Sequence, residues 1–414
     1  MAQYDNWKIS ALGERAEEVR DLYEPNKEEE SLYIGLEHIE QQSLRITAIG
    51  SSSDTISTKK IFQSGDILFG SLRPYFRKVV RPKFGGVCST DITVIMAKEN
   101  TDQGFLQYFI ANQEFIDHAS NISSGTRMPR ANWKVLAKSE WRFPLLPTQR
   151  KIAAILSAYD DLIENNLQRI KILEEIAKAL YREWFVKFRF PGHEKTRMVD
   201  SPMGKIPEGW ELKTVGDTFE ILGGGTPSKK IEKYWAEGDI MWYVPSDLTA
   251  SKTMFMDSSS TQITELGLTK SSARLFSPFS VMMTSRATLG VIAINTTEAS
   301  TNQGFITCLP NERFPLHNLY HWLMENVETF ISLSSGATFK EITKGVFKTI
   351  EMVVPAKNIA RAFEDNVELL AEHVLNLQRK NEALRRTRDL LLPKLISGEL
   401  DVSDLDIKTG GHMQ

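Results

Sequence analysis

The chain of 414 residues contains only two cysteines, Cys88 and Cys308, and they form no Cys-x-x-Cys pair. This scarcity argues against a disulfide framework or a structural zinc site and indicates a reducing compartment. The sequence also has no apolar run near the length of a membrane span, and no basic-then-apolar leader at its N-terminus. We therefore expect a cytoplasmic protein that has no membrane partner.

Catalytic signatures are missing as well. The sequence has neither the Asn/Asp-Pro-Pro-aromatic tetrad of amino methylation nor a Gly-x-Gly-x-x-Gly turn, which excludes the usual S-adenosylmethionine and dinucleotide sites. It also lacks His-Glu-x-x-His and Gly-x-Ser-x-Gly, and its seven histidines have no ligand spacing. Asp200 and the Glu-x-Lys run from Glu211 to Lys213 faintly resemble a nuclease metal site, but that run lies inside a repeated motif. We predict no catalytic residue, no metal site and no cofactor in this chain.

The charge of the chain is small in total but unevenly distributed. The net charge is −3, and residues 14–40 hold ten acids against three bases. Residues 59–83 reverse this balance with seven bases against Asp66, and residues 127–151 carry seven bases against Glu140. Such an asymmetry can give a nearly neutral protein a positive face.

What the sequence does contain is an internal repeat. Trp, four residues, a branched apolar residue, Gly and an acid begin at Trp7 and again at Trp210, an offset of 203. Two further recurrences have an offset of 211: Ser89-Thr90 with Ser300-Thr301, and Ser123-Ser124-Gly125 with Ser334-Ser335-Gly336. A period of about 200 residues fits a domain plus a helix rather than a solenoid unit. The repeat predicts two similar modules that bind two similar things at a fixed separation.

Each module continues into a long heptad-patterned helix, from Thr148 to Phe185 and from Ala360 to Leu395. When Asn166 is set opposite Asn381 in an antiparallel pair, the apolar positions of the two helices also face each other. A buried Asn pair fixes register, because any slip leaves amides against hydrocarbon. We therefore predict an antiparallel two-helix coiled coil whose register residues are Asn166 and Asn381.

The same register places Tyr159 opposite Arg388, for which we predict a contact between the ring and the guanidinium group. The paired helices would form a rod about 55 Å long, at 1.5 Å per residue. The alternative is that each amphipathic helix packs only on its own domain.

The segments before and after the first long helix contain short alternating and β-branched runs, and each has one clear helix near its own end. This pattern predicts two domains of mixed sheet and helix. We call these two domains the first head and the second head. The predicted fold class is α+β, with two pseudo-repeated domains of mixed β-sheet and helix separated by the antiparallel coiled coil. The predicted boundaries are 1–147 for the first head, 148–190 for the first helix, 191–206 for a linker, 207–355 for the second head, 356–400 for the second helix and 401–414 for a tail.

Several loops of the heads have residues suited to nucleic acid. The Ser-Ser-Gly loops at 123–127 and 334–338 offer hydroxyl and N–H groups for phosphate, although each can also be a helix-terminating turn. The loop from Gly223 to Lys230 is no P-loop, because no Gly-Lys-Ser/Thr follows at the proper spacing. It is basic and flexed by glycine, as a loop on a nucleic-acid backbone would be, or it is an ordinary surface loop.

Two lone arginines on predicted strands near small polar residues, Arg73 and Arg286, are the best candidates for guanine edges, with a structural ion pair as the alternative for each. The full set of residues that we predict to face DNA is Ser71, Arg73, Arg77, Lys78, Arg127, Thr226, Lys229, Lys230, Arg286, Asn302, Gln303 and Lys340.

Together these motifs resemble the specificity subunit of type I restriction–modification systems over essentially the whole chain. The stretches that carry the resemblance are Pro207-Glu208-Gly209-Trp210 with Gly224 to Ser228, Gln149 to Ala153, Leu392 to Leu400 and Tyr33 to Glu37. The first head lacks the Gly-Gly-Thr-Pro-Ser loop. The resemblance accounts for this difference, because recognition domains of that family diverge with their target sequence.

The resemblance implies a non-catalytic subunit with two target-recognition domains, each reading half of a split, asymmetric sequence in double-stranded DNA. It implies that the helices set the spacing of the half-sites and dock two modification subunits, which carry S-adenosylmethionine and usually methylate adenine N6. Restriction and translocase subunits, with ATP and Mg²⁺, would complete the complex. A gap of several base pairs between the half-sites is expected.

Two alternatives remain open at this point. The chain could be the equivalent DNA reader of a related methylation or phage-defence complex, or a coiled-coil scaffold whose heads bind protein. Salt separates DNA from peptide as the ligand, because binding to DNA weakens steeply as salt is added.

Overall fold

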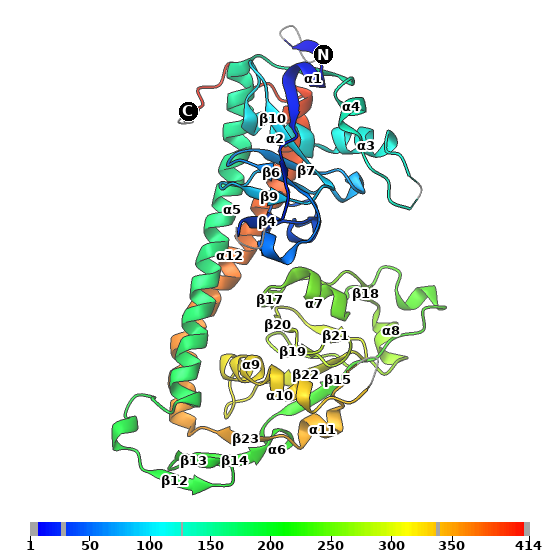
Figure 1. The fold of residues 1–414 in the computed structure, drawn as a ribbon. Coiled ribbons are helices and arrows are strands. Elements are labelled where there is room, and N and C mark those ends of the chain that lie inside the picture. Colours follow the sequence, from blue (N-terminus) through cyan, green and yellow to red (C-terminus); the bar gives the residue numbers. More distant parts are fainter. Residues whose placement is uncertain (1–6, 26–29, 126, 337–339, 410–414) are drawn as a thin grey trace. The chain divides into compact units, whose positions relative to one another are not determined.

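The computed structural model describes residues 7–25, 30–125, 127–336 and 340–409. They form two compact units, one of residues 1–164 with 382–414 and the other of residues 165–381. Each unit contains one head and one half of each long helix, α5 (Leu146–Tyr181) and α12 (Lys357–Ser397) (Figure 1). Within the described ranges, no helix combines the length and the apolarity needed to cross a bilayer.

The first head is built on two sheets. A four-stranded sheet has the order β2-β10-β7-β8, and a five-stranded sheet has the order β3-β6-β9-β4-β5, in which β4 and β9 are parallel. Strand β1 pairs with β11, which brings the entry and the exit of the head together. The elements are β1 (Lys8–Ala11), α1 (Leu12–Arg15), β2 (Ala16–Val19), β3 (Leu22–Tyr23), β4 (Leu32–Ile34), β5 (Gly50–Ser51), β6 (Lys59–Phe62), β7 (Ile67–Gly70), β8 (Val79–Val80), β9 (Gly86–Cys88), β10 (Ile92–Ala97), α2 (Gln103–Ala111), α3 (Gln113–Asn121), α4 (Trp133–Leu136) and β11 (Glu140–Phe143).

The second head repeats this arrangement. Its larger sheet has the order β15-β22-β19-β20-β17, its smaller sheet has the order β18-β16-β21 with β16 and β21 parallel, and β14 pairs with β23. A hairpin of β12 (Met198–Ser201) and β13 (Gly204–Pro207) precedes it. The elements are β14 (Glu211–Thr214), α6 (Val215–Thr218), β15 (Glu220–Gly223), β16 (Ile240–Tyr243), α7 (Pro245–Ser251), β17 (Phe255–Met256), β18 (Gln262–Ile263), α8 (Glu265–Thr269), β19 (Val281–Thr284), β20 (Ile292–Asn295), β21 (Ala299–Thr301), β22 (Phe305–Leu309), α9 (Leu316–Glu325), α10 (Val327–Ser332), α11 (Lys344–Lys348) and β23 (Glu351–Val354).

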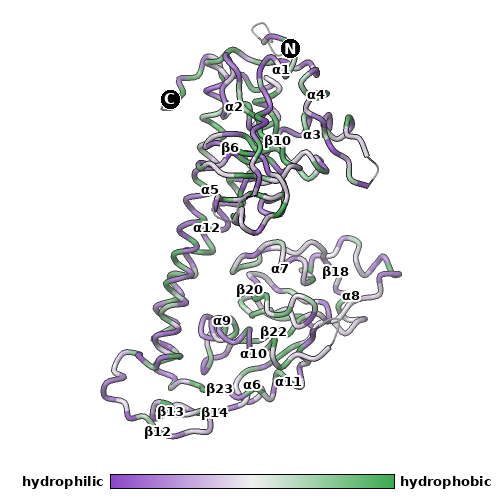
Figure 2. The backbone as a smooth tube through the Cα atoms, viewed as in Figure 1, coloured by the Kyte–Doolittle hydropathy of each residue, from purple (hydrophilic) through white to green (hydrophobic). Residues whose placement is uncertain are grey.

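Local sequence explains the central elements of both heads. Strands β10 and β22 are runs of β-branched and apolar residues that are buried on both faces, as central strands require. Asp102 starts α2 by accepting a hydrogen bond from the Phe105 N–H at 2.9 Å, a side-chain N-cap. In Figure 2 the central strands of each head are largely hydrophobic, whereas both long helices alternate in hydropathy along their length. The predicted α+β class is confirmed.

Strand pairing shows which residues of the two heads are equivalent. Ala11 pairs with Glu140 as Thr214 pairs with Glu351, so the repeat that begins at Trp7 and Trp210 is structural. The Ser-Thr recurrence is not. Cys88 pairs with Ile34, and the residue that pairs in the same way in the second head is Thr301. Ser89-Thr90 is therefore equivalent to Asn302-Gln303, two residues later than the sequence match suggests.

The two long helices pack antiparallel within each unit. In the first unit, Ile152 and Leu156 share a core with Leu392 and Leu395. In the second unit, the equivalent core joins positions of α5 such as Ile170 and Ala177 to Val367, Val374 and Leu377 of α12. Asn166 and Asn381 are both buried, and the Asn166 Nδ2 donates to the Asn381 Oδ1 at 2.8 Å. The helices therefore pair in the register that the heptads predict.

The predicted partner of Arg388 is wrong by one residue. Arg388 is 3% exposed, and its guanidinium group donates to the carboxylate of Asp160 rather than stacking on Tyr159. Tyr108 of α2 donates to the other oxygen of that carboxylate at 2.6 Å, and Asp389 accepts from Arg388 at 3.0 Å. The ion pair forms instead of the ring contact because a buried guanidinium group needs hydrogen-bond acceptors for its N–H groups, and an aromatic ring is a poor acceptor.

The asparagine pair gives a first prediction. Asn381→Leu is expected to destabilise the second unit by about 1–3 kcal/mol, because the Asn166 amide loses its buried partner. The double variant Asn166→Leu with Asn381→Leu is expected to recover that loss, since it replaces both partners with hydrocarbon. Urea unfolding of wild type, the single variant and the double variant measures both effects. A double variant as unstable as the single one would contradict the pairing.

Candidate nucleic-acid interface

In the first head, Arg73 and Arg127 come together at the loop after β7. Arg73 has a φ of 51°, and its backbone N–H donates to the Pro129 carbonyl at 2.8 Å. Its Nη2 donates to the Arg127 carbonyl at 3.3 Å. The loop that follows β7 and the segment that follows the Ser-Ser-Gly turn are thus joined by backbone and side-chain bonds, although Thr126 lies outside the described residues.

The neighbouring Arg130 joins the same place from the second segment. Its Nε lies 2.9 Å from the Asp91 Oδ1, and both side chains are partly exposed. Bridges of backbone hydrogen bonds link Arg130 to Leu72 and to Ser124. Ser71 is buried beneath this surface, and its hydroxyl donates to the Asp91 carbonyl at 2.7 Å. Ser71 therefore anchors the loop instead of projecting from it.

Arg77 and Lys78 do not join that cluster. The Lys78 ammonium donates to the Leu36 carbonyl, and burial lowers its pKa. Burial also lowers the pKa of Arg77, whose charged neighbours are Asp389 and Arg388 of α12. The structure places these two candidates against other parts of the first unit, and not beside Arg73.

In the second head, a glycine loop and the turn between β21 and β22 come together. Thr226 Oγ1 donates to the Gln303 Oε1 at 2.6 Å. A Cβ on Gly224 would lie only 2.0 Å from the Asn302 carbonyl oxygen, so only glycine permits this approach. Trp242 Nε1 holds the loop by donating to the Gly225 carbonyl at 2.9 Å. The Gly-Gly-Thr run is therefore a packing requirement that delivers Thr226 to Gln303.

Arg286 reaches the same turn from the end of β19. Its Nε lies 3.5 Å from where a Cβ on Gly304 would stand. Among the described residues it has no ion-pair partner, unlike Arg130 of the first head. The Asn302 Oδ1 accepts from the Gly304 N–H at 2.8 Å, and the Ala287 N–H donates to the Lys340 carbonyl at 3.2 Å. The fold thus brings together five of the candidates, Thr226, Arg286, Asn302, Gln303 and Lys340. The exposed lysines at 229 and 230 follow Thr226 in the glycine loop. Of the predicted loop at 334–338, residues 337–338 lie outside the described residues.

Backbone contacts of these loops show which positions of the two heads are equivalent. The Ala131 N–H donates to the Ser71 carbonyl, as the Ile342 N–H does to that of Ser285. Arg286 is therefore equivalent to Leu72, and Arg73 to Ala287, which shares its positive φ. The same framework carries different hydrogen-bonding groups in the two heads.

A sequence model described as "Type I restriction modification DNA specificity domain" matches residues 4–175 and 207–377, one match for each head and its helix. The chain belongs to this family. It is a DNA-recognition subunit that works in a restriction–modification complex and is not itself the enzyme. The two matches have the same spacing as the repeat seen in the sequence.

Relatives agree with this assignment. The type I restriction enzyme MjaIX specificity subunit of Methanocaldococcus jannaschii is 26% identical, over 84% of this chain and 80% of that protein. The HindI specificity subunit of Haemophilus influenzae is 24% identical, over 95% of this chain and 100% of that protein. The crystal structure of a type I S subunit from M. genitalium shares the fold, with a TM-score of 0.58, 16% identity and coverage of 94% and 96% of the two chains.

One residue beside these loops, Lys344, was not among those predicted from the sequence. Lys344 begins α11, which Thr343 caps, and its Nζ approaches Gly223 so closely that a Cβ there would lie 2.6 Å away. The signal available was the capped helix start shortly after Lys340. In the part of the chain that is described, no three His, Cys, Asp or Glu side chains gather as a metal site would require.

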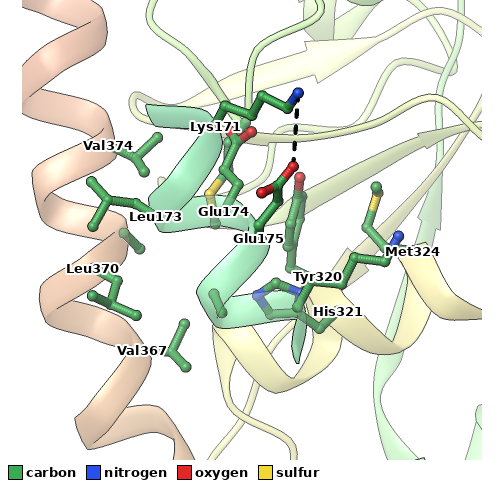
Figure 3. A pocket seen from close by; sticks show the side chains of 14 residues that line it. Lys171, Leu173, Glu174, Glu175, Tyr320, His321, Met324, Val367, Leu370 and Val374 are labelled. Atoms are coloured by element: carbon green, nitrogen blue, oxygen red, sulfur yellow. Dashed lines mark ion pairs between the residues drawn. The ribbon is translucent and has the colours of Figure 1, made fainter. Parts of the chain in front are cut away.

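A cavity of about 250 Å³ lies away from these loops, in the second unit between α5, α9 and α12. Its walls are mostly apolar, and Figure 3 shows Glu174, Tyr320 and His321 among its lining side chains. Burial raises the pKa of Glu174 to about 7 and, with His317 and Lys178 nearby, lowers that of His321 to about 3. Both side chains are therefore held toward their neutral forms.

Glu174 predicts a pH effect on stability. Its pKa is about 7 in the folded chain against an ordinary 4.5, so the folded state binds the proton more tightly. The stability that this provides is complete below about pH 4.5 and is lost as the pH rises through 7. The glutamine of Glu174→Gln stays neutral at every pH. The difference in free energy of unfolding between this variant and wild type is therefore expected to shift in favour of the variant by about 1–3 kcal/mol from pH 5 to pH 8.

Urea unfolding of wild type and Glu174→Gln at both pH values measures this difference. The exposed neighbour Glu175 supplies a matched control, as Glu175→Gln. A gap between wild type and Glu174→Gln that is the same at pH 5 and pH 8 would contradict the assignment.

Proposed function

We propose that this chain reads a bipartite, asymmetric target in double-stranded DNA, one half-site for each head. The observation that carries the proposal is the shared framework of the two heads. Backbone bonds place loops from equivalent strands together in both, yet the polar side chains on these loops are Arg73, Arg127 and the Arg130–Asp91 pair in one head and Arg286 with Gln303 in the other. Similar scaffolds with different donors and acceptors suit two different base sequences.

The helix pair would set the distance between the half-sites and dock two modification subunits. Those subunits would bind S-adenosylmethionine and methylate adenine, and restriction or translocase subunits with ATP and Mg²⁺ would act on unmodified DNA. The family supports partners of these kinds, and the two-fold repeat of head and helix supports the proposal of two modification subunits. A complex of this composition would work in the cytoplasm, where its DNA lies.

The ionic-strength dependence of binding tests this function. The complex with its modification subunit is titrated against a labelled duplex by fluorescence anisotropy. If the exposed lysines and arginines contact six or more phosphates, affinity is expected to fall about a thousandfold or more between 50 and 200 mM salt. A duplex with both half-sites scrambled serves as the control and is expected to bind more weakly than the target duplex at the same salt concentration, with its own steep fall as salt is added. A complex that binds neither duplex at any salt concentration would instead indicate a protein-binding scaffold.

A further inference from the structure

The turn between β21 and β22 holds the backbone of Gln303 firmly. The Asn302 N–H donates to the Tyr243 carbonyl at 3.0 Å, and the Ser285 N–H donates to the Gly304 carbonyl at 2.8 Å. The Asn302 side chain closes the turn on the Gly304 N–H. Gln303 itself is exposed, so a fixed backbone presents its side-chain amide at the surface of the second head.

Thr226 orients that amide. Its hydroxyl donates to the Gln303 Oε1 at 2.6 Å, which turns the oxygen toward the glycine loop. The oxygen keeps a second lone pair, and both Nε2 hydrogens stay available, since an amide has two acceptor and two donor positions. The amide therefore keeps an acceptor position and donor positions for a ligand, on a side chain that is exposed. That is the pattern that matches the adenine edge in the major groove, where N6 donates and N7 accepts.

The surroundings favour a nucleic-acid ligand for this amide. Arg286 lies beside Gly304, and Lys344 lies beside Gly223. The exposed lysines at 229 and 230 follow Thr226 in the chain, and the exposed Lys340 accepts a backbone hydrogen bond from Ala287, the residue after Arg286. Glu341, which bridges to Arg286 through its backbone, is the acid at this edge. Lysines of this kind suit phosphates, whereas a fixed amide suits a base.

The first head has no such amide. The residue equivalent to Gln303 is Thr90, and Gly304 is replaced by Asp91, which pairs with Arg130. The glycine loop is also absent from the first head. At this turn, an exposed amide oriented by a threonine is therefore found in the second head and not at the equivalent described position of the first.

We infer that Gln303, oriented by Thr226, reads an adenine in the second half-site. The inference rests on the proposed function and assigns a base to one residue of it. Gln303 is a specificity-determining residue here, and Thr226 is a positioning residue that acts through it.

The experiment is selection of bound duplexes from a randomised library by the complex with its modification subunit, followed by sequencing. Wild type is expected to select a split sequence with an A·T pair at one position of the second half-site. Gln303→Glu is expected to replace that preference with C·G, because a carboxylate accepts from cytosine N4 but cannot donate to adenine N7; the loss of adenine preference is about 10- to 100-fold.

Two further variants separate the positioning role from a folding defect. Thr226→Val, which removes the hydroxyl, is expected to weaken the same adenine preference, and Thr226→Ser, which keeps it, is expected to behave as wild type. The first half-site should be unchanged in all of them. An intact adenine preference in Gln303→Glu, or equal loss at every position, would overturn the inference. A wild-type complex that selects no split sequence would refute the proposed function as well.

Discussion

Arg286→Ala is expected to remove recognition of the second half-site while the first half-site is still bound. The guanidinium has no ion-pair partner among the described residues, Arg286 is partly exposed, and its Nε lies beside Gly304. A guanidinium without an ion-pair partner can bind guanine O6 and N7 in bidentate fashion, and losing such a contact costs about 1–3 kcal/mol of discrimination. The effect should therefore be confined to the second half-site.

Binding of the variant complex to duplexes with either half-site scrambled measures this result. Arg361→Ala is a matched control, because Arg361 is an exposed arginine on α12 that pairs only with Asp365 at the surface. Equal weakening on every duplex, with a salt slope smaller by about one, would make Arg286 a phosphate contact instead.

Arg73→Ala is the corresponding change in the first head and should affect the first half-site alone. Here part of the loss has a second cause, because the Arg73 guanidinium also bonds to the Arg127 carbonyl. The equivalence of Arg73 with Ala287 indicates that the two arginines approach their half-sites from neighbouring, not identical, positions. The same pair of scrambled duplexes distinguishes the two heads.

Arg388→Leu is expected to destabilise the first unit by about 2–4 kcal/mol, since it leaves the Asp160 carboxylate without its cation. The value lies below that for a fully buried pair because Asp160 keeps 27% of its side chain exposed. Tyr108, which donates to the same carboxylate, should become less well fixed, so the loss reaches from the helix pair into the head.

Urea unfolding followed by tryptophan fluorescence measures this loss. Arg386→Leu, on the exposed side of the same helix, is the control and should change little. The double variant Arg388→Leu with Asp160→Leu is expected to recover much of the stability, because no charge is left unpaired. An Arg388→Leu protein as stable as the control would show that the network carries no free energy.

The helix pair could be predicted from sequence because its information is local. Heptad spacing defines one face of each helix, and the coincidence of Asn166 with Asn381 then selects a single register. What the pattern could not distinguish was which neighbour Arg388 would choose, since Tyr159 and Asp160 are adjacent on the same turn. The tertiary position of Tyr108 decides that choice in favour of the carboxylate.

The heads could be predicted only in outline. Two of their parallel pairs, β4 with β9 and β16 with β21, join segments more than fifty residues apart through strands of three or four residues. A short strand carries too little pattern to name its partner. Matching Ser89-Thr90 to Ser300-Thr301 failed for a related reason, because the spacing between equivalent strands differs in the two heads.

The candidate residues divide in the same way. Exposed lysines of the glycine loop follow from composition, but the contact of Thr226 with Gln303 spans 77 positions and depends on the close approach of Gly224. Ser71 and Lys78 are polar residues that the fold uses for its own backbone carbonyls. No local pattern separates such residues from those that face a ligand.

Mapping methylated adenines in a host genome is the measurement that tests the two-reader account most directly. The chain is expressed together with its modification subunit, and the methylated sites are compared with those of cells that carry the modification subunit alone. One split motif, methylated in both halves and changed in only one half by Arg286→Ala, is the result that the account predicts. A stable complex that adds no methylated split motif would contradict it.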